Sequence, residues 1–324
     1  MVISVSNLSK KYTVFKKDPG LAGSLKSLIR RKYETVKAVE SVSFEIDEGE
    51  LVGFIGPNGA GKTTTLKCLS GILYPTAGKI SVLGFNPYER KKDFLKQIGL
   101  VMGQKNQLWW DLPAVDTFIL QKEIYEISDS EYKKTLGDLL DLLSAKDIVK
   151  VPVKKLSLGQ RMKMEIVATL LHSPKVLFLD EPTIGLDVVM QKNLRDFIKE
   201  FNKKYKSTII LTSHYMKDVE DLCKRVIIIN HGKILYDGEL SKLVAKYSPY
   251  KHIIINFKDK INPSDFSQFG EIESYNHPRL ELLVKRSLAS VAVSKILTDH
   301  KIEDINIEEP EIEDVIRKVF GENE

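Results

Sequence analysis

One glycine-rich loop limits most strongly how this chain of 324 residues can fold. It reads Gly56-Pro57-Asn58-Gly59-Ala60-Gly61-Lys62-Thr63 and matches the pattern G-x-x-x-x-G-K-[ST]. An apolar run of strand length, residues 51–55, precedes the loop, and a helix is expected from about Lys62 to Ser70. Glycine lets backbone N–H groups approach phosphate oxygens, and the helix N-terminus attracts their negative charge. The sequence therefore predicts a strand–loop–helix unit that binds the phosphates of a nucleotide.

Several side chains are suited to act on a bound nucleoside triphosphate. Lys62 can reach the β- and γ-phosphates, the hydroxyl of Thr63 can bind Mg²⁺, and Thr64 follows in the same helix. A second apolar run, residues 176–179, ends in Asp180, which we expect to hold Mg²⁺ directly or through water. Glu181 follows at once and is the candidate general base that polarises the attacking water.

Two further polar residues follow apolar runs and are candidates for the same site. His214 ends the stretch Leu211-Thr212-Ser213-His214, where it could contact the γ-phosphate and sense its loss. Gln104 ends Val101-Met102-Gly103-Gln104 and could reach Mg²⁺ and the attacking water. A lone histidine is usually structural, and Gln104 taken alone favours neither a functional nor a structural role.

The pattern of apolar residues predicts two domains. Strands alternate with helices over residues 1–247, which predicts an α/β sheet containing parallel strands. Residues 13–36 interrupt this pattern as an insertion, and residues 116–143 and 159–172 have helical spacing. Short strands and helices then predict a small α+β domain over residues 248–324.

Composition and charge limit the class of protein and its compartment. The chain has 43% hydrophobic and 29% charged residues, typical of a soluble globular protein. No apolar run approaches the roughly 20 residues that span a bilayer, and we expect no secretory signal at the N-terminus. Cys68 and Cys223 are expected to be reduced and structural. Basic residues concentrate between Lys10 and Lys37, which suggests an anionic partner surface, either lipid or nucleic acid.

The order of these motifs resembles that of the nucleotide-binding subunits of ATP-binding cassette (ABC) transporters, over about residues 1–240. Leu156-Ser157-Leu158-Gly159-Gln160 is similar to the family's LSGGQ signature, and Gly185-Leu186-Asp187 to its D-loop. Tyr12 resembles the aromatic residue that stacks on adenine, Gln104 the Q-loop glutamine and His214 the switch histidine. The resemblance implies a P-loop NTPase with a RecA-like α/β core, an antiparallel β subdomain and a helical subdomain at about residues 104–172.

The resemblance also implies that two subunits share the chemistry. In this family two cassettes pair head to tail, and each ATP lies between one phosphate loop and the partner's signature. Ser157, Gly159 and Gln160 would then contact the nucleotide of a second subunit, with ATP and Mg²⁺ bound and ATP hydrolysed. The third signature position is Leu158 where glycine is usual, and we expect Ser157 and Gly159 to suffice.

Other segments resemble the ATPases of the ABC-2 exporter group, of the daunorubicin-resistance type: the run LSLGQRMKME, the segment Gln107–Pro113, the insertion and the C-terminal domain. That group implies a homodimer, separate integral membrane permeases, peripheral contact at the cytoplasmic face of the cell membrane, and no nucleic acid. The alternative is a soluble ABC ATPase that acts on nucleic acid or ribosomes. The basic insertion favours that alternative, whereas the single phosphate loop and the lack of a long coiled coil oppose it.

Two hypotheses go beyond the family. Within the insertion, apolar residues at 21, 25, 28 and 29 would share one helical face beside basic residues at 26 and 30–32. Such a helix would lie on the membrane surface or the permease, or it could be a solvated excursion. Trp109 and Trp110 are the two tryptophans of the chain; one of them would anchor a permease, or both would pack in the core.

Overall fold

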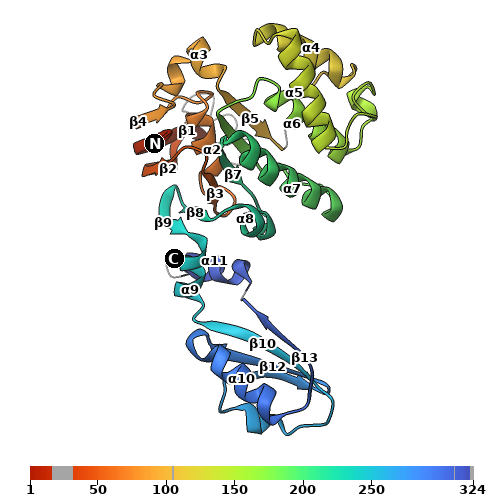
Figure 1. Cartoon of the computed structure of the whole chain (residues 1–324). Helices are drawn as coiled ribbons and strands as arrows, with labels where there is room; N and C mark the ends of the chain where they lie inside the picture. The colour runs from red at the N-terminus through yellow and green to blue at the C-terminus, as the bar shows by residue number, and fades with distance from the viewer. Residues whose placement is uncertain (17–31, 104–105, 310, 322–324) are drawn as a thin grey trace, which may run out of the picture. The chain divides into compact units, whose positions relative to one another are not determined.

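The computed structural model describes residues 1–16, 32–103, 106–309 and 311–321. The chain divides into two compact units, Met1–Gly238 and Glu239–Glu324 (Figure 1). None of the helices in the described ranges combines the length and apolarity that crossing a bilayer needs.

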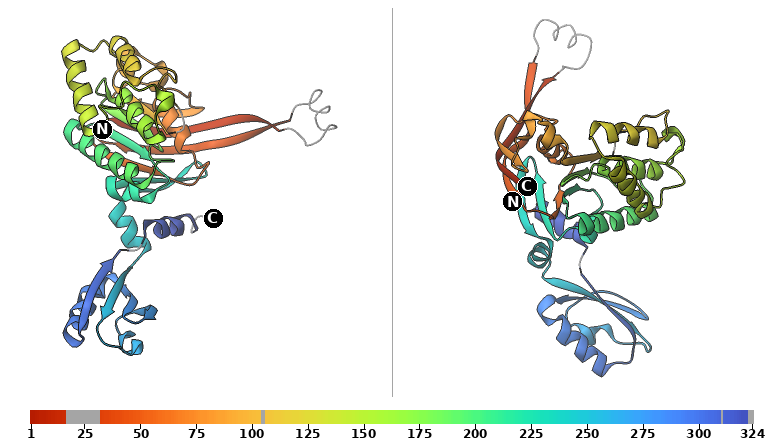
Figure 2. Two further views of the ribbon diagram at one scale, coloured as in Figure 1. Left: turned by 90° about the vertical axis from the view of Figure 1, so that its right-hand side faces the viewer. Right: turned by 45° about the horizontal axis from the view of Figure 1, so that its top comes forward.

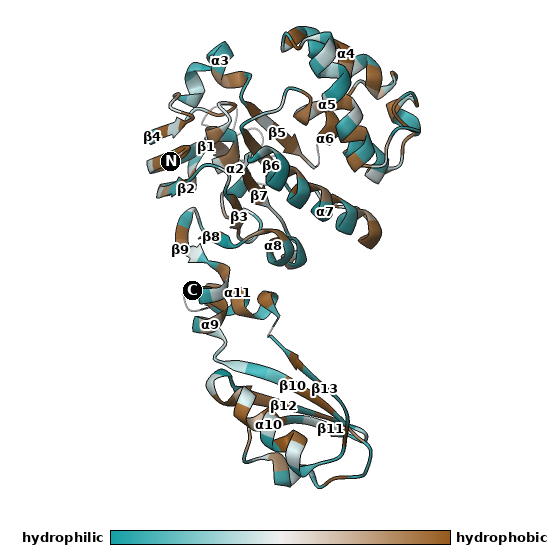
Figure 3. Cartoon of the chain, in the orientation of Figure 1, coloured by the Kyte–Doolittle hydropathy of each residue, from teal (hydrophilic) through white to brown (hydrophobic). Residues whose placement is uncertain are grey.

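A six-stranded sheet forms the centre of the first unit. Its strands, in spatial order, are β5 (Ile98–Met102), β6 (Val176–Asp180), β7 (Thr208–Thr212), β3 (Leu51–Ile55), β8 (Arg225–Asn230) and β9 (Lys233–Glu239). The first five strands pair in parallel, and every residue of β6 and β7 is buried. Parallel strands covered on both faces are continuously apolar, as the hydropathy colouring in Figure 3 illustrates. Their carboxyl ends share one edge, which collects the residues that follow β3, β6 and β7.

A second, antiparallel sheet has the strand order β2-β1-β4, with β1 (Ile3–Lys16), β2 (Lys32–Ile46) and β4 (Ala77–Val82). β1 and β2 pair as far as Lys16↔Lys32 and project as two long arms (Figure 2). The expectation that residues 13–36 interrupt the strands is therefore wrong at both ends, because cross-strand pairs such as Phe15 and Tyr33, with ring centroids 6.2 Å apart, continue the ladder. The helix expected in the insertion falls outside the described residues, except that Lys32 belongs to β2.

Helices cover the central sheet and form a separate cluster. The α-helices of the first unit are α2 (Lys62–Leu69), α3 (Lys92–Leu95), α4 (Ala114–Ile124), α5 (Asp129–Leu142), α6 (Leu158–Leu170), α7 (Val188–Tyr205) and α8 (Met216–Leu222). Short 3₁₀ turns occupy Pro87–Glu89 and Val153–Lys155. α4 and α5 both pack on α6, away from the antiparallel sheet (Figure 1). The predicted α/β core, antiparallel β subdomain and helical subdomain are all confirmed.

The second unit is a small α+β domain. Its elements are α9 (Leu240–Tyr247), β10 (Tyr250–Phe257), β11 (Glu271–Asn276), β12 (Arg279–Lys285), α10 (Ala289–Asp299), β13 (Ile302–Glu308) and α11 (Ile312–Gly321), with 3₁₀ turns at Pro263–Phe266 and Arg286–Leu288. The antiparallel sheet has the order β11-β12-β10-β13. Alternate residues of β10 (Ile253, Ile255 and Phe257) are buried with Ala292 and Ile296 of α10, as strand periodicity requires. The predicted C-terminal α+β fold is confirmed.

Candidate functional site

The phosphate loop joins β3 to α2 and depends on glycine at three points. A Cβ at Gly56 would lie 2.1 Å from the carbonyl oxygen of Ile229, and one at Gly61 would lie 2.4 Å from that of Ala38. Gly59 has a φ of 80° and Gly61 a φ of 110°, a region that side chains disfavour. No described heavy atom lies within 4 Å of a Cβ built at Gly59, so the loop is open there. This open, side-chain-free surface can admit phosphate oxygens.

The loop residues between these glycines have distinct places. Pro57 and Asn58 are exposed, whereas Ala60 is buried and its carbonyl oxygen accepts the N–H of Gly232 at 3.0 Å. Thr64 is half-buried in the first turn of α2. The loop is thus fixed at its base and exposed at its tip.

Lys62 presents a buried positive charge beneath the loop. Lys62 is only 5% exposed, and its Nζ donates to the carbonyl oxygens of Gly56 at 2.6 Å and Pro57 at 3.1 Å. Burial lowers the pKa of Lys62, while the charges of Glu181 and Asp180 raise it. Among the described residues no carboxylate forms a direct ion pair with this ammonium. A bound anion such as phosphate fits this charge.

Thr63 and Asp180 form an oxygen-rich pair across the site. The Thr63 hydroxyl donates to the two carboxylate oxygens of Asp180 at 2.8 and 3.1 Å, and Thr212 Oγ1 donates to Oδ1 of Asp180 at 2.8 Å. Hydroxyl and carboxylate oxygens are the donors that Mg²⁺ prefers, beside phosphate oxygens. The residues present therefore fit a magnesium ion held by Thr63 and Asp180.

Glu181 and His214 are in direct contact. Nε2 of His214 lies 2.6 Å from Oε1 of Glu181. Glu181 has a φ of 54°, unusual for a residue with a side chain, and its N–H donates to the carbonyl oxygen of Thr212 at 3.1 Å and to Oγ1 at 3.0 Å. β7 therefore fixes the backbone that presents the candidate base.

A buried network behind this pair was not found from the sequence. Asp218 is fully buried and accepts hydrogen bonds from Thr183 Oγ1 at 2.5 Å, Ser213 Oγ at 2.6 Å and Arg195 Nη1 at 2.9 Å. Ser213 precedes His214, and Thr183 lies two residues after Glu181. Asp218 thus ties together the two loops that carry the candidate base and its histidine. The available signal was an acid placed four residues after His214, at the start of a helix.

The signature residues start α6. Ser157 is its N-cap: the Ser157 hydroxyl accepts the Gln160 N–H at 3.2 Å, and Gln160 Oε1 accepts the Ser157 N–H at 3.0 Å. A Cβ on Gly159 would lie 3.0 Å from Met190 Cε, and one on Gly185 of the D-loop would lie 2.9 Å from Leu158 Cδ2. In the described residues no hydrogen bond or ion pair joins Ser157, Gly159 or Gln160 to the phosphate loop.

The remaining candidates lie at the margins of the site. Tyr12 is 36% exposed and pairs with Val36 of β2, two residues from the Ala38 carbonyl that abuts Gly61. Gln104 falls outside the described residues, but the N–H of the preceding Gly103 donates to the Asp180 carbonyl oxygen at 2.9 Å.

Comparison with known proteins agrees with this geometry. The family described as ABC transporter matches residues 39–184, and the C-terminal domain of EvrA-like ABC transporters matches residues 249–308. The ABC transporter ATP-binding protein NatA of Bacillus subtilis is 35% identical over 212 residues, which cover 65% of this chain and 86% of NatA. The bacitracin transport ATP-binding protein BcrA of Bacillus licheniformis is 30% identical, covering 77% of this chain and 83% of BcrA.

Solved structures share the fold. An ATP binding subunit of an ABC transporter aligns with a TM-score of 0.64 at 26% identity, covering 76% of this chain and 93% of that chain. A dimeric ATP-binding cassette bound to ADP and Pi aligns with a TM-score of 0.60 at 22% identity, covering 73% and 98%. The phosphate loop, the residues that follow β6 and β7, and these relatives lead to one conclusion: the chain belongs to the ABC transporter family, as an ATP-hydrolysing, ATP-binding subunit of the ABC-2 exporter group.

Proposed function

We propose that two copies of this chain bind Mg²⁺-ATP between them and power export through a separate membrane permease. One observation carries the proposal: Lys62, Thr63, Asp180, Glu181 and His214 form one connected cluster, to which the described signature residues of the same chain are not bonded. In the proposed pair, Ser157 and Gly159 of one copy face the nucleotide held by the other. The backbone N–H groups at the start of α6 suit the γ-phosphate.

Within each site the chain's own residues would divide the work. Lys62 and the loop N–H groups bind the phosphates, and Tyr12 contacts the adenine. Mg²⁺, held by Thr63, Asp180 and Gln104, would neutralise charge on the phosphates. Glu181 accepts a proton from water, and His214, 2.6 Å away, keeps Glu181 in place and contacts the γ-phosphate.

The permease would dock beside the tryptophan pair. Trp109 and Trp110 are 49% and 48% exposed, which contradicts the interpretation that both pack in the core. Their backbone is held, because the carbonyl oxygen of Trp110 accepts the N–H of Lys154 at 2.9 Å. Asn106 and Gln107, which precede the tryptophans, line a groove of 480 Å³ together with apolar side chains such as Leu100, Met102 and Tyr125 and with polar ones such as His172. A rigid backbone with half-exposed indole rings suits an interface anchor.

Removing both indole rings should weaken assembly without harming the ATPase fold. We expect Trp109→Ala combined with Trp110→Ala to lower permease affinity by about thirtyfold or more, since one aromatic anchor that becomes buried in an interface is worth about 2 kcal/mol. The measurement is copurification of the full chain with membrane proteins encoded by adjacent reading frames, alongside the melting temperature. Leu297→Ala, an exposed apolar residue of α10, is the matched control. Normal assembly, or loss of folding by the double variant, would contradict the anchor role.

Location and direction follow from the same proposal. A chain that docks on a permease would be held peripherally at the cytoplasmic face of the membrane, with the nucleotide sites in the cytosol. The similarity to a bacitracin transport protein supports export rather than import. We also propose that the ATP-binding domain ends at residue 247 and that the C-terminal domain starts at residue 248. The C-terminal domain would lengthen the contact between the two copies.

A further inference from the structure

The helix that begins at the signature also holds the tryptophan segment. Glu165 of α6 is 3% exposed, and its Oε1 accepts the N–H groups of Gln107 at 2.9 Å and Leu108 at 3.3 Å. Its Oε2 lies 3.1 Å from the same N–H of Gln107. Hydrogen bonds to a buried carboxylate are the stronger kind. Residues 107 and 108 are therefore fixed to α6 immediately before the two tryptophans.

A second contact joins the same helix face to the same segment. Arg161 lies one turn before Glu165, so the two side chains share one face of α6. The Arg161 guanidinium carbon lies 5.5 Å from the ring centroid of Trp110, within the range of a cation–π contact. From the N-cap Ser157 to Glu165 is eight residues, or about 12 Å of rigid helix. One straight element thus runs from the signature to the tryptophan segment.

The buried charge of Glu165 needs a reason. Its neighbours Met164, Ile166, Val167 and Ala168 are apolar and buried, so packing alone would favour an apolar residue at this position. Burial raises the pKa of Glu165, whereas the N–H groups of Gln107 and Leu108 and the charge of Arg161 lower it. The hydrogen bonds from Gln107 and Leu108 therefore do two things: they stabilise the ionised carboxylate of Glu165, and they hold residues 107 and 108 against α6. We therefore assign Glu165 the role of holding this segment.

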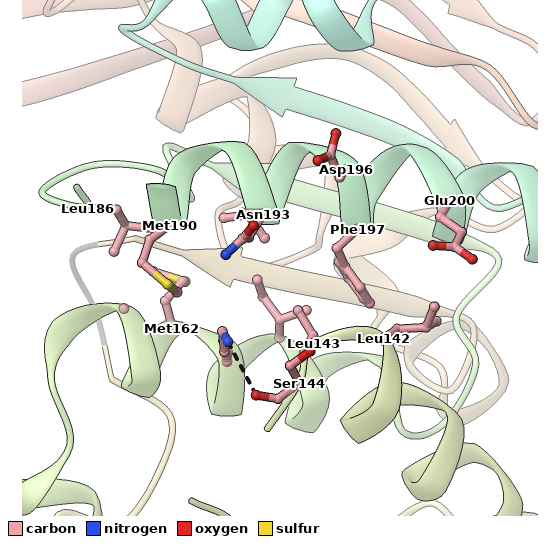
Figure 4. Close-up of a pocket in the computed structure, with 14 residues that line it drawn as sticks. Leu142, Leu143, Ser144, Met162, Leu186, Met190, Asn193, Asp196, Phe197 and Glu200 are labelled. Carbon is pink, nitrogen blue, oxygen red and sulfur yellow. Dashed lines mark hydrogen bonds between the residues drawn. The ribbon is translucent and has the colours of Figure 1, made fainter. Parts of the chain in front are cut away.

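A pocket flanks α6 near its contact with α7. A part-open pocket of 190 Å³ lies beside the contact between α6 and α7; it is lined by Met162 of α6, by Leu186, Met190 and Phe197, and by Leu143 at the end of α5 (Figure 4). Side chains of the two helices therefore line an open space there instead of packing against each other. Gln107 is also bonded to the catalytic sheet, because its Nε2 donates to the Leu100 carbonyl oxygen of β5 at 2.7 Å. The tryptophan segment therefore lies between α6 and β5, where a shift of one against the other acts on it.

We propose that Glu165 is a positioning residue that makes the segment 107–110 follow α6, so that engagement of nucleotide at the signature is transmitted to the exposed tryptophans. The inference rests on the proposed function of Ser157 and of the tryptophan surface. It predicts that binding of nucleotide changes the environment of Trp109 and Trp110, and that this change depends on Glu165 while nucleotide affinity does not.

The two tryptophans, the only ones in the chain, provide the readout. Intrinsic tryptophan emission of the full chain is recorded while Mg²⁺ and a slowly hydrolysed ATP analogue are added, and analogue affinity is measured separately by calorimetry. Glu165→Leu removes both acceptor oxygens at similar volume, and Glu165→Gln keeps one. Lys163→Gln is the matched control, since Lys163 bonds α6 to a different segment, through the Ser144 carbonyl oxygen at 3.4 Å.

We expect the analogue to change the emission of the wild-type chain and of Lys163→Gln equally. In Glu165→Leu the change should fall about fivefold or more, with affinity altered less than about twofold, and Glu165→Gln should lie between them. A full emission response in Glu165→Leu, or no response in the wild-type chain that binds the analogue, would overturn the proposal. So would equal loss of affinity and response in both variants, which indicates a purely structural role. A wild-type chain that binds no analogue would instead refute the proposed function.

Discussion

Replacing Glu181 by Gln is expected to leave ATP bound but to slow its hydrolysis by about a hundredfold or more, because an amide cannot accept the proton of the attacking water. Gln keeps the size and shape of the side chain, and the backbone stays fixed by the two hydrogen bonds to Thr212. ATP that is bound and not hydrolysed should also hold two copies together. Phosphate release and the mass of the ATP-bound species in solution are the measurements.

The control for this variant is a carboxylate away from the site. Glu131, at the start of α5 and exposed, can be changed to Gln without touching any residue of the cluster. We expect its turnover to equal that of the unmodified chain. Hydrolysis by Glu181→Gln within a few fold of normal would mean that another group activates the water, and the role given to Glu181 would be wrong.

Replacing Lys62 by Ala should abolish useful nucleotide affinity. The ammonium is buried, and its hydrogen-bond partners among the described residues are carbonyl oxygens, so a phosphate is the partner that it fits. Truncating one side of a buried, hydrogen-bonded charge pair costs about 3 kcal/mol, which corresponds to roughly a hundredfold in Kd. Titration calorimetry with ATP and Mg²⁺ measures the loss.

A surface lysine serves as the comparison for that variant. Lys92 of α3 pairs with Glu126 on the outside of the unit, and its removal should change ATP affinity less than twofold, or about 0.4 kcal/mol. Burial lowers the pKa of Lys62 because it disfavours the charged ammonium. A bound anion would offset that cost, since it stabilises the ammonium and not the neutral amine. Equal affinity in Lys62→Ala and the unmodified chain would remove the phosphate-binding role.

Much of the candidate site could be predicted because its residues lie in short contiguous motifs. A few consecutive residues are enough to identify each of three segments: the phosphate loop, the strand that ends in Asp180 and the strand before His214. Parallel strands bring their carboxyl ends to one edge, so the contact between Thr63 and Asp180 follows from the order of the elements. The same local reading placed Ser157 at a helix start, where its hydroxyl caps α6.

The residues that were missed depend on contacts between distant segments. Asp218 is an ordinary helical acid in the sequence, and only the fold surrounds it with Thr183, Ser213 and Arg195. Glu165 interrupts an apolar helix, but its partners are the N–H groups of Gln107 and Leu108, which lie 58 and 57 positions earlier in the chain. The arms of β1 and β2 were also missed, since their charged residues hide the alternation that the hairpin pairing exploits. Long-range pairing decides all three cases.

In the proposed dimer, each chain alone holds an incomplete ATP site. The most direct test mixes two inactive variants, Lys62→Ala, which lacks the phosphate ligand, and Ser157→Arg, which blocks the signature. In a head-to-tail pair, half the dimers are mixed and each contains one intact composite site of two. The mixture should therefore recover roughly a quarter of wild-type ATP hydrolysis per chain. A mixture as inactive as either variant alone would contradict the claim, because it would place the signature and the phosphate loop of one site on the same chain.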